Sequence, residues 1–78
     1  MKEEIRTMLE DLLPLVDFDA SFLFAELDSL GITAILMTLS RAYGIELDAQ
    51  DVTPKNFKSI DSLAQLVQNK IDSKRQDG

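Results

Sequence analysis

The chain has 78 residues, no cysteine, no histidine and a formal net charge of −6 at pH 7. A length of 78 residues corresponds to one small domain. The missing residue types exclude a disulfide, an ordinary zinc site and a serine–histidine triad. The acidic balance argues against a nucleic-acid partner, because phosphates bind lysine and arginine, and it favours a basic protein partner.

The sequence also bears on membranes and on metals. No apolar run is long enough to span a bilayer, and the first stretch, MKEEIRTMLEDLL, is acidic where a signal peptide would be basic. We therefore expect a cytoplasmic monomer without membrane insertion. The acids of DAQDVTPKNFKS lack the glycine and the closing glutamate of an EF-hand loop, so no metal site is expected there.

A first helix is predicted over residues 2–13, where Pro14 ends it by disfavouring helical geometry in the preceding residue. Its apolar residues recur at steps of three and four and form one stripe: Ile5, Met8, Leu9, Leu12 and Leu13. Residues 14–27 form a long connection, which we expect to contain a short helical turn. Its apolar residues should hold it against the core: Phe18, Phe22, Leu23 and Phe24.

A second helix is predicted over residues 29–43, with Asp28 as its N-cap and Gly44 as its C-cap. At 3.6 residues per turn, one side of this helix carries Ile32, Ile35, Leu36, Leu39 and Tyr43. The other side carries Leu30, Thr33, Ala34, Met37 and Arg41. No carboxylate occurs between Asp28 and Glu46.

The absence of carboxylates from the second helix has two interpretations. The helix is either surrounded by the others and buried on all sides, or its second side stays partly exposed as a docking surface. Complete burial is demanding in so small a domain, and methionine adapts to varied partners. We therefore favour a docking surface made by Leu30, Thr33, Ala34, Met37 and Arg41.

The remaining chain is predicted to be helical as well. In the connection at residues 45–52, three side chains should face inward: Ile45, Leu47 and Val52. The stretch TPKNFK reads as one short helical turn, with Thr53 as cap, Pro54 in first position and Phe57 packed inside. Ser59 caps a last helix, whose apolar stripe is Ile60, Leu63, Ala64, Val67 and Ile71. Three main helices and one short helix indicate an all-α protein, a small four-helix bundle over residues 1–74 with a flexible tail at 75–78.

Ser29 lies where the long connection meets the second helix. Serine is common at such positions for capping alone. However, the first-turn N–H groups have no intrahelical acceptors and the helix dipole is positive there, so a phosphate ester on Ser29 would be stabilised. As a catalytic nucleophile Ser29 is implausible, because the chain supplies no suitable base.

At this point the motifs resemble a known family. The segment LDSLG entering a helix, then YGIEL, TPKNFKS and a final amphipathic helix, is similar to acyl carrier proteins over nearly the whole chain. The resemblance implies that Ser29, flanked by Asp28 and Leu30, is esterified by 4′-phosphopantetheine. A phosphopantetheinyl transferase would install this group from coenzyme A.

The resemblance also implies a function. The thiol of the arm would carry an acyl or aminoacyl thioester, and the protein would present it to ligases or synthases without catalysing a reaction itself. Part of the core could open to shelter an acyl chain. The core and acyl-pocket positions implied by the family are Ile35, Leu36, Leu39, Ile45, Leu47, Phe57, Leu63 and Val67.

The chain departs from the family pattern in two places. Glu26 stands where a glycine is usual, and Gly31, Ala34 and Ser40 stand where carriers of fatty-acid synthesis place acids. We therefore expect docking through apolar contact, with a mild salt dependence, and a specialised carrier. Its pathway could be a ligase-loaded or D-alanyl-type one, specialised lipid synthesis, or polyketide or nonribosomal peptide assembly. The alternative is an unmodified helical adaptor that binds a protein through the apolar face of the second helix.

Overall fold

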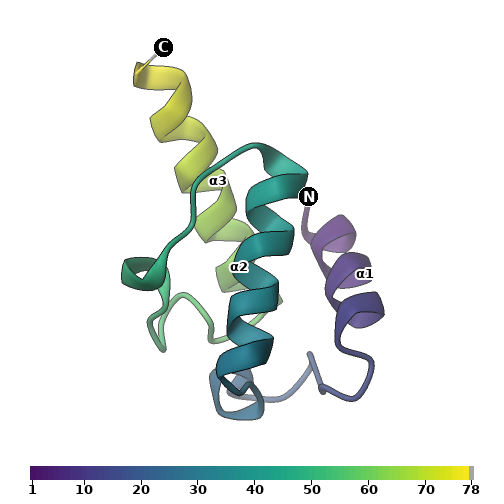
Figure 1. Ribbon diagram of the computed structural model, residues 1–78. Helices are drawn as coiled ribbons and strands as arrows, with labels where there is room; N and C mark the ends of the chain where they lie inside the picture. Colours follow the sequence, from purple (N-terminus) through teal and green to yellow (C-terminus); the bar gives the residue numbers. More distant parts are fainter. Residues whose placement is uncertain (78) are drawn as a thin grey trace.

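The computed structural model describes residues 1–77, and its regular elements are all helical (Figure 1). The α-helices are α1 (Lys2–Leu12), α2 (Ser29–Tyr43) and α3 (Ile60–Asp77). Two short 3-10 helices lie in the connections, η1 (Leu23–Glu26) and η2 (Ala49–Asp51). The predicted all-α class and the order of the three main helices are therefore confirmed.

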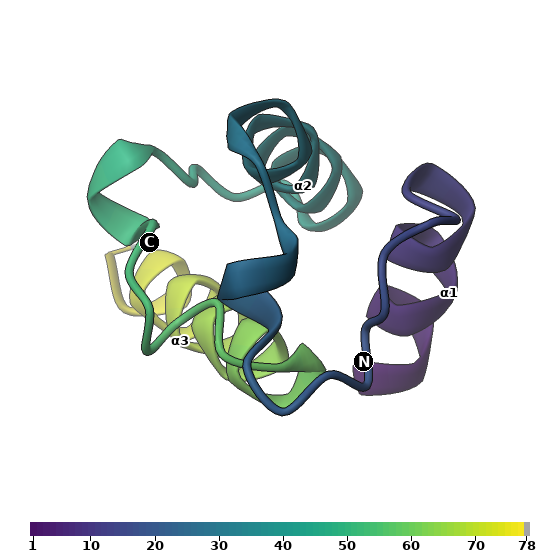
Figure 2. The same ribbon diagram turned by 90° about the horizontal axis from the view of Figure 1, so that it is seen from below.

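Each of the three α-helices contacts the other two. Helix α1 runs antiparallel to α2, so the end of α1 and the start of α2 lie at the same end of the molecule (Figures 1 and 2). The side chains enclosed between the helices and connections form one hydrophobic cluster: Ile5, Leu9, Phe18, Leu23, Ile35, Leu39, Ile45, Phe57, Ile60, Leu63, Leu66 and Val67. The burial of this apolar surface is the main force that holds the helices together.

The boundaries of α1 and α2 follow from local chemistry. Helix α1 ends one residue before the predicted limit, because Leu13 leaves helical geometry ahead of Pro14. Helix α2 has the predicted bounds, and Gly44 closes it in the left-handed conformation with φ 61° and ψ 38°. Glycine adopts this conformation without the steric cost that a Cβ brings. Within the predicted stripe of α1, Ile5 and Leu9 are buried, whereas Leu12 is 38% exposed.

The long connection between α1 and α2 is held against the core by three of the four predicted residues, whereas Phe22 is 42% exposed. Phe18 and Leu23 are buried, and the ring of Phe24 packs edge-on against Phe57 with centroids 6.3 Å apart. The amide N–H of Leu23 donates to the carbonyl oxygen of Lys58 at 2.9 Å, which joins this connection to the segment before α3. The expected helical turn is η1.

The short fourth helix expected at residues 53–58 is only a single turn. The N–H of Phe57 donates to the carbonyl oxygen of Thr53 at 3.0 Å, and the N–H of Asn56 donates to the Thr53 hydroxyl at 3.0 Å. The predicted cap and the burial of Phe57 are thus confirmed, but the turn does not continue as a helix. The carbonyl of Lys58 is already engaged by Leu23, and the next residue, Ser59, caps α3.

Helix α3 begins as predicted and extends further than predicted. Ser59 and Ser62 cap its start reciprocally: each hydroxyl accepts the N–H of the other residue, at 3.1 and 2.9 Å. The predicted stripe is buried or half-buried, and Leu66 joins it. The helix continues to Asp77, so residues 75–77 of the expected tail are helical here. The domain limit at residue 74 and the flexibility of the tail remain predictions.

Candidate functional site

The start of α2 is fixed by the side chain of Asp28. Its Oδ1 accepts a hydrogen bond from the N–H of Gly31 at 2.7 Å, and its carbonyl oxygen accepts one from Ile32 at 2.9 Å. The backbone of Asp28 is extended, with φ −102° and ψ 179°, as is typical of an N-cap. Asp28 therefore marks where the connection ends and sets the direction in which the first turn points.

Ser29 is the first residue of α2, and it is exposed to solvent. The helix start lies at the lower end of the molecule in Figure 1, where the connection from α1 arrives. The N–H groups of a first turn have no acceptors within the helix and carry the positive end of its dipole. The hydroxyl of Ser29 is thus reachable, and the site favours a negatively charged substituent such as a phosphate ester.

The two sides of α2 differ as the periodicity predicted. On the core side, Ile35 and Leu39 are fully buried, and the other members are partly buried against the core: Ile32, Leu36 and Tyr43. On the other side, Leu30 is 81% exposed and Met37 is 56% exposed. Thr33 and Arg41 are exposed as well, and Ala34 is half-buried. Helix α2 is therefore not surrounded by the other helices, and the side that lacks carboxylates faces solvent.

A shallow groove of about 460 Å³ runs along this exposed side, between α2 and the connection that follows it. Its lining residues are Thr33, Leu36, Met37, Ser40, Arg41 and Leu47. Ser29, Thr33, Leu36 and Ser40 are separated by steps of three and four, so the groove lies along the same row of the helix as Ser29.

Two of the positions that lack the usual acids turn out to have structural roles. Gly31 is buried, and a Cβ placed there would lie 3.2 Å from Oδ1 of Asp28, 3.6 Å from Cδ1 of Leu13 and 3.8 Å from Cδ2 of Leu27. Ser40 is half-buried, and its hydroxyl accepts the N–H of Leu47 at 3.2 Å. Both residues hold neighbouring segments in place, so a carboxylate at either position would be crowded or partly buried.

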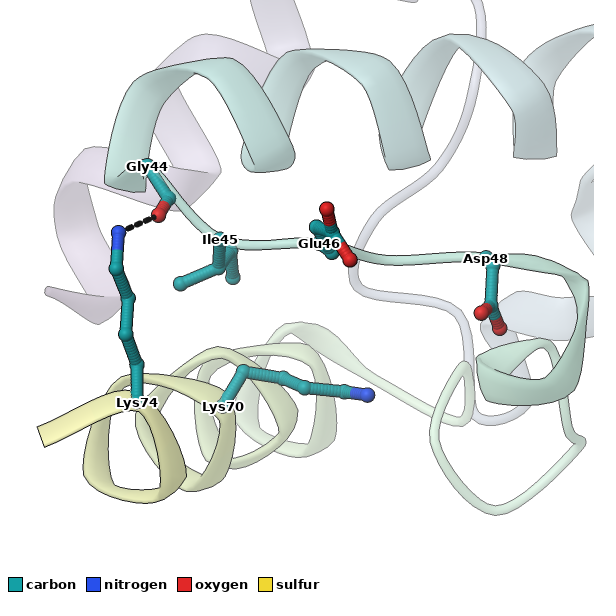
Figure 3. Close-up of a pocket in the computed structure, with 6 residues that line it drawn as sticks. All are labelled: Gly44, Ile45, Glu46, Asp48, Lys70 and Lys74. Atoms are coloured by element: carbon teal, nitrogen blue, oxygen red, sulfur yellow. Dashed lines mark hydrogen bonds between the residues drawn. The ribbon is translucent and has the colours of Figure 1, made fainter. Parts of the chain in front are cut away.

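The connection after α2 is fastened to α3 by two lysines. The ammonium group of Lys74 donates to the carbonyl oxygen of Gly44 at 2.5 Å (Figure 3), and that of Lys70 pairs with Asp51 at 3.1 Å. Between these contacts lies an open cleft of about 480 Å³, bordered by Ile45, Glu46 and Asp48 among others (Figure 3). Its charges are mixed, since two lysines face two acids, so it favours neither an anion nor a cation.

The positions that the family resemblance assigned to the core all lie there. Six are buried: Ile35, Leu39, Ile45, Phe57, Leu63 and Val67. Leu36 and Leu47 are partly buried against the cluster. These residues come from α2, α3 and the segments between them. The core therefore lies against α2 on the side opposite to the exposed one.

The described residues offer neither a metal centre nor a membrane-spanning helix. No group of three or more acidic side chains in the described part of the chain is placed to hold a metal ion. Among residues 1–77, none of the helices combines the length and the apolar character that crossing a bilayer needs.

Fold and site together define a class of protein: a small helical domain that displays one serine at a capped helix start. The family of the phosphopantetheine attachment site matches residues 3–67, which is most of the chain. The chain belongs to this family of non-catalytic carrier domains, whose prosthetic group is 4′-phosphopantetheine. Neither a curated protein nor a solved structure was found to match it.

The residues present fit this group. An exposed hydroxyl lies at the electropositive end of a helix, and the cap hydrogen bond from the N–H of Gly31 to Asp28 holds that first turn in place. The sequence pointed to Ser29 as a candidate and predicted which side of α2 is buried, but it did not predict the turn at residues 13–16, which lies near the start of α2. The only local sign of that turn is Pro14 followed by Leu15, and a proline at this position also indicates simply that the helix ends.

Proposed function

We propose that Ser29 is the attachment point of 4′-phosphopantetheine and that the protein is a specialised acyl or aminoacyl carrier. The single observation that supports this best is the exposure of Ser29 at the start of α2, with Asp28 as cap and Leu30 on the other side. A buried Ser29 would have been unreachable for a transferase. The match to the family over residues 3–67 includes this position.

Each residue at the site has a separate role in this proposal. Ser29 contributes the oxygen of the new phosphate ester, and its proton passes to a base of the transferase. The pyrophosphate bond of coenzyme A breaks in the same step, and adenosine 3′,5′-bisphosphate leaves. Asp28 holds the first turn by accepting the N–H of Gly31. The terminal thiol of the attached arm supplies the thioester chemistry that a chain without cysteine lacks.

Partner enzymes would dock on the exposed side of α2. Leu30 and Met37 offer apolar surface next to Ser29, and Thr33, Ala34 and Arg41 complete the face. This face carries no carboxylate, so apolar contact would contribute more to affinity than charge pairing does. That property is the reason to place the protein in specialised lipid, polyketide, nonribosomal peptide or D-alanyl-type pathways rather than in housekeeping fatty-acid synthesis.

The core would shelter a cargo only after rearrangement. The side chains beneath α2 are closely packed, so an acyl chain that entered would have to separate α2 from the connection at residues 45–52. The hydrogen bond from Leu47 to Ser40 and the contact of Lys74 with Gly44 would resist this movement. A short acyl or aminoacyl group that stays outside the core would leave both contacts intact.

The test is enzymatic loading followed by mass spectrometry. The full chain is incubated with coenzyme A and a broad-specificity phosphopantetheinyl transferase, and we expect it to gain the mass of one phosphopantetheine. Ser29→Ala should abolish the gain. Ser21→Ala removes another exposed serine and should leave the gain unchanged. Failure of the wild-type chain to react with several transferases would contradict the proposal.

The adaptor alternative uses the same exposed face and makes the opposite prediction. If the protein acts unmodified, Ser29→Ala should preserve its function and Met37→Glu should destroy it, because a charge would be placed within the docking surface. If the protein is a carrier, Ser29→Ala abolishes function completely. Comparing the two variants in the same complementation assay separates the two functions.

A further inference from the structure

The turn between α1 and the long connection displays a leucine that serves no purpose in folding. The N–H of Val16 donates to the carbonyl oxygen of Leu13 at 3.1 Å, which closes a four-residue turn. Pro14 occupies the second position, where its fixed φ stiffens the turn. Leu15 follows at the tip, and it is 99% exposed. The turn therefore presents an apolar side chain to solvent from a rigid base.

Behind this turn lies a groove of about 350 Å³ at the end of the molecule that carries Ser29. Its apolar lining includes Leu13, Val16, Leu27 and Gly31. A methyl group at Gly31 would be in van der Waals contact with Leu13 and Leu27, so the glycine leaves that part of the groove open. The groove is lined by residues from the end of α1, the connection and the start of α2, and Figure 2 shows this connection leading from α1 to α2.

The polar lining of the groove is acidic. Glu26 and Asp28 both line it, both are exposed, and the lining contains no lysine or arginine. Neither carboxylate takes part in the ion pairs found between residues 1 and 77. A groove that combines apolar side chains with two carboxylates outside any ion pair is complementary to an apolar side chain that has a basic neighbour.

The groove lies next to the hydroxyl that the transferase has to reach. Asp28 precedes Ser29 directly, and Gly31 belongs to the same first turn of α2. An enzyme that forms a bond to the oxygen of Ser29 must cover this turn, and with it the edge of the groove. Position and chemistry therefore point to the same occupant of the groove, the enzyme that modifies Ser29.

We propose that the Leu13–Val16 turn and the groove behind it are a docking element for the phosphopantetheinyl transferase, separate from the exposed side of α2. The inference rests on Ser29 being the attachment site. The transferase inserts an apolar side chain into the groove beside Leu15 and places an arginine or lysine against Glu26 and Asp28. Glu26, which departs from the glycine that the family resemblance leads us to expect, thereby gains a role in recognition.

The experiment measures the kinetics of loading by a broad-specificity transferase with coenzyme A. Leu15→Ser should raise KM for the protein by about tenfold with kcat unchanged, because a leucine buried on binding is lost. Glu26→Gln should raise KM by about two- to fivefold, and 0.5 M salt should remove most of that difference. The matched controls are Phe22→Ser, another exposed apolar residue of the same connection, and Asp72→Asn, an exposed acid of α3.

The outcomes separate this inference from the proposed function. If the wild-type chain is never loaded, the attachment site itself is wrong. If it is loaded and Leu15→Ser has a KM within twofold of wild type, only the docking element is wrong. An equal loss in Phe22→Ser would also overturn it, because the effect would then not be specific to the turn. Leu15→Lys is a second variant. Its KM should be higher than that of Leu15→Ser, because the added positive charge repels the basic residue of the transferase, and a KM equal to wild type would overturn the docking element.

Discussion

Replacing Asp28 by alanine tests the reasoning about the site most directly. The change removes the hydrogen bond of 2.7 Å between Oδ1 and the N–H of Gly31, and it removes a negative charge from the positive end of α2. Loss of an N-cap costs about 1 kcal/mol, and loss of the charge at a helix start costs about 0.5 kcal/mol. We expect Asp28→Ala to lower the free energy of unfolding by about 1.5 kcal/mol.

Asp28→Asn separates the two contributions. The asparagine keeps an oxygen that accepts the N–H of Gly31 and loses only the charge, so its cost should be about one third of that of alanine. Asp11→Ala is a matched control, because it deletes an exposed carboxylate in the last turn of α1, at the negative end of that helix. There the free energy of unfolding should be unchanged or slightly higher.

The assay is urea unfolding followed by far-ultraviolet circular dichroism. With a slope of about 1 kcal/mol per molar urea for a chain of this size, the midpoint of Asp28→Ala should fall by about 1.5 M. A midpoint within about 0.3 M of wild type would refute the cap as the residue that fixes the start of α2. If asparagine cost as much as alanine, the charge rather than the hydrogen bond would be responsible.

Two further predictions concern the core and the acid–base behaviour of α2. Leu39→Ala should lower the free energy of unfolding by about 2–5 kcal/mol, because it leaves a cavity in the core. Leu30→Ala, at an 81% exposed position, should change it by less than about 0.5 kcal/mol. Similar urea midpoints for the two variants would show that the buried and exposed sides of α2 are misassigned. Burial, and then the neighbouring Glu4 carboxylate, which accepts the Tyr43 hydroxyl at 3.3 Å, raise the pKa of Tyr43 above the usual value of about 10. Because the pKa is raised in the folded state, this contribution to stability is present below pH 10 or so and is lost as the pH rises through the raised pKa. Tyr43 is the only tyrosine of the chain, so its absorbance titration reports this group alone: the midpoint should lie above that of a tyrosine peptide and should move down in Glu4→Gln, and a midpoint unaffected by Glu4→Gln would contradict the contact.

Much of the fold could be predicted because its signals are local. Asp28 and Gly44 bound α2 by interactions within three to five residues, and the steps of three and four in each helix identify the side that is buried. The turn at residues 53–58 shows the limit of such reasoning. Its cap and first residue are favourable for a helix, but a tertiary hydrogen bond from Leu23 to the carbonyl of Lys58 engages the chain before a helix can continue.

The candidate site likewise combines features that adjacent residues predict with features that depend on distant segments. Ser29 could be proposed from its neighbours, because a hydroxyl next to a helix cap is recognisable from adjacent residues. The roles of Gly31 and Ser40 could not be found in this way, since they depend on Leu13, Leu27 and Leu47, which reach them from other segments. The groove beside Leu15 likewise exists only where the end of α1 and the start of α2 meet.

The amino-acid sequence by itself thus determined the three main helices, the limits of α2 and the place of Ser29 at its capped start, because caps, prolines and apolar spacing act over a few residues. Only the tertiary structure decided which surfaces stay open: the side of α2 with Leu30 and Met37, and the turn with Leu15. Exposure depends on which distant segments pack against a residue, and no local pattern contains that information.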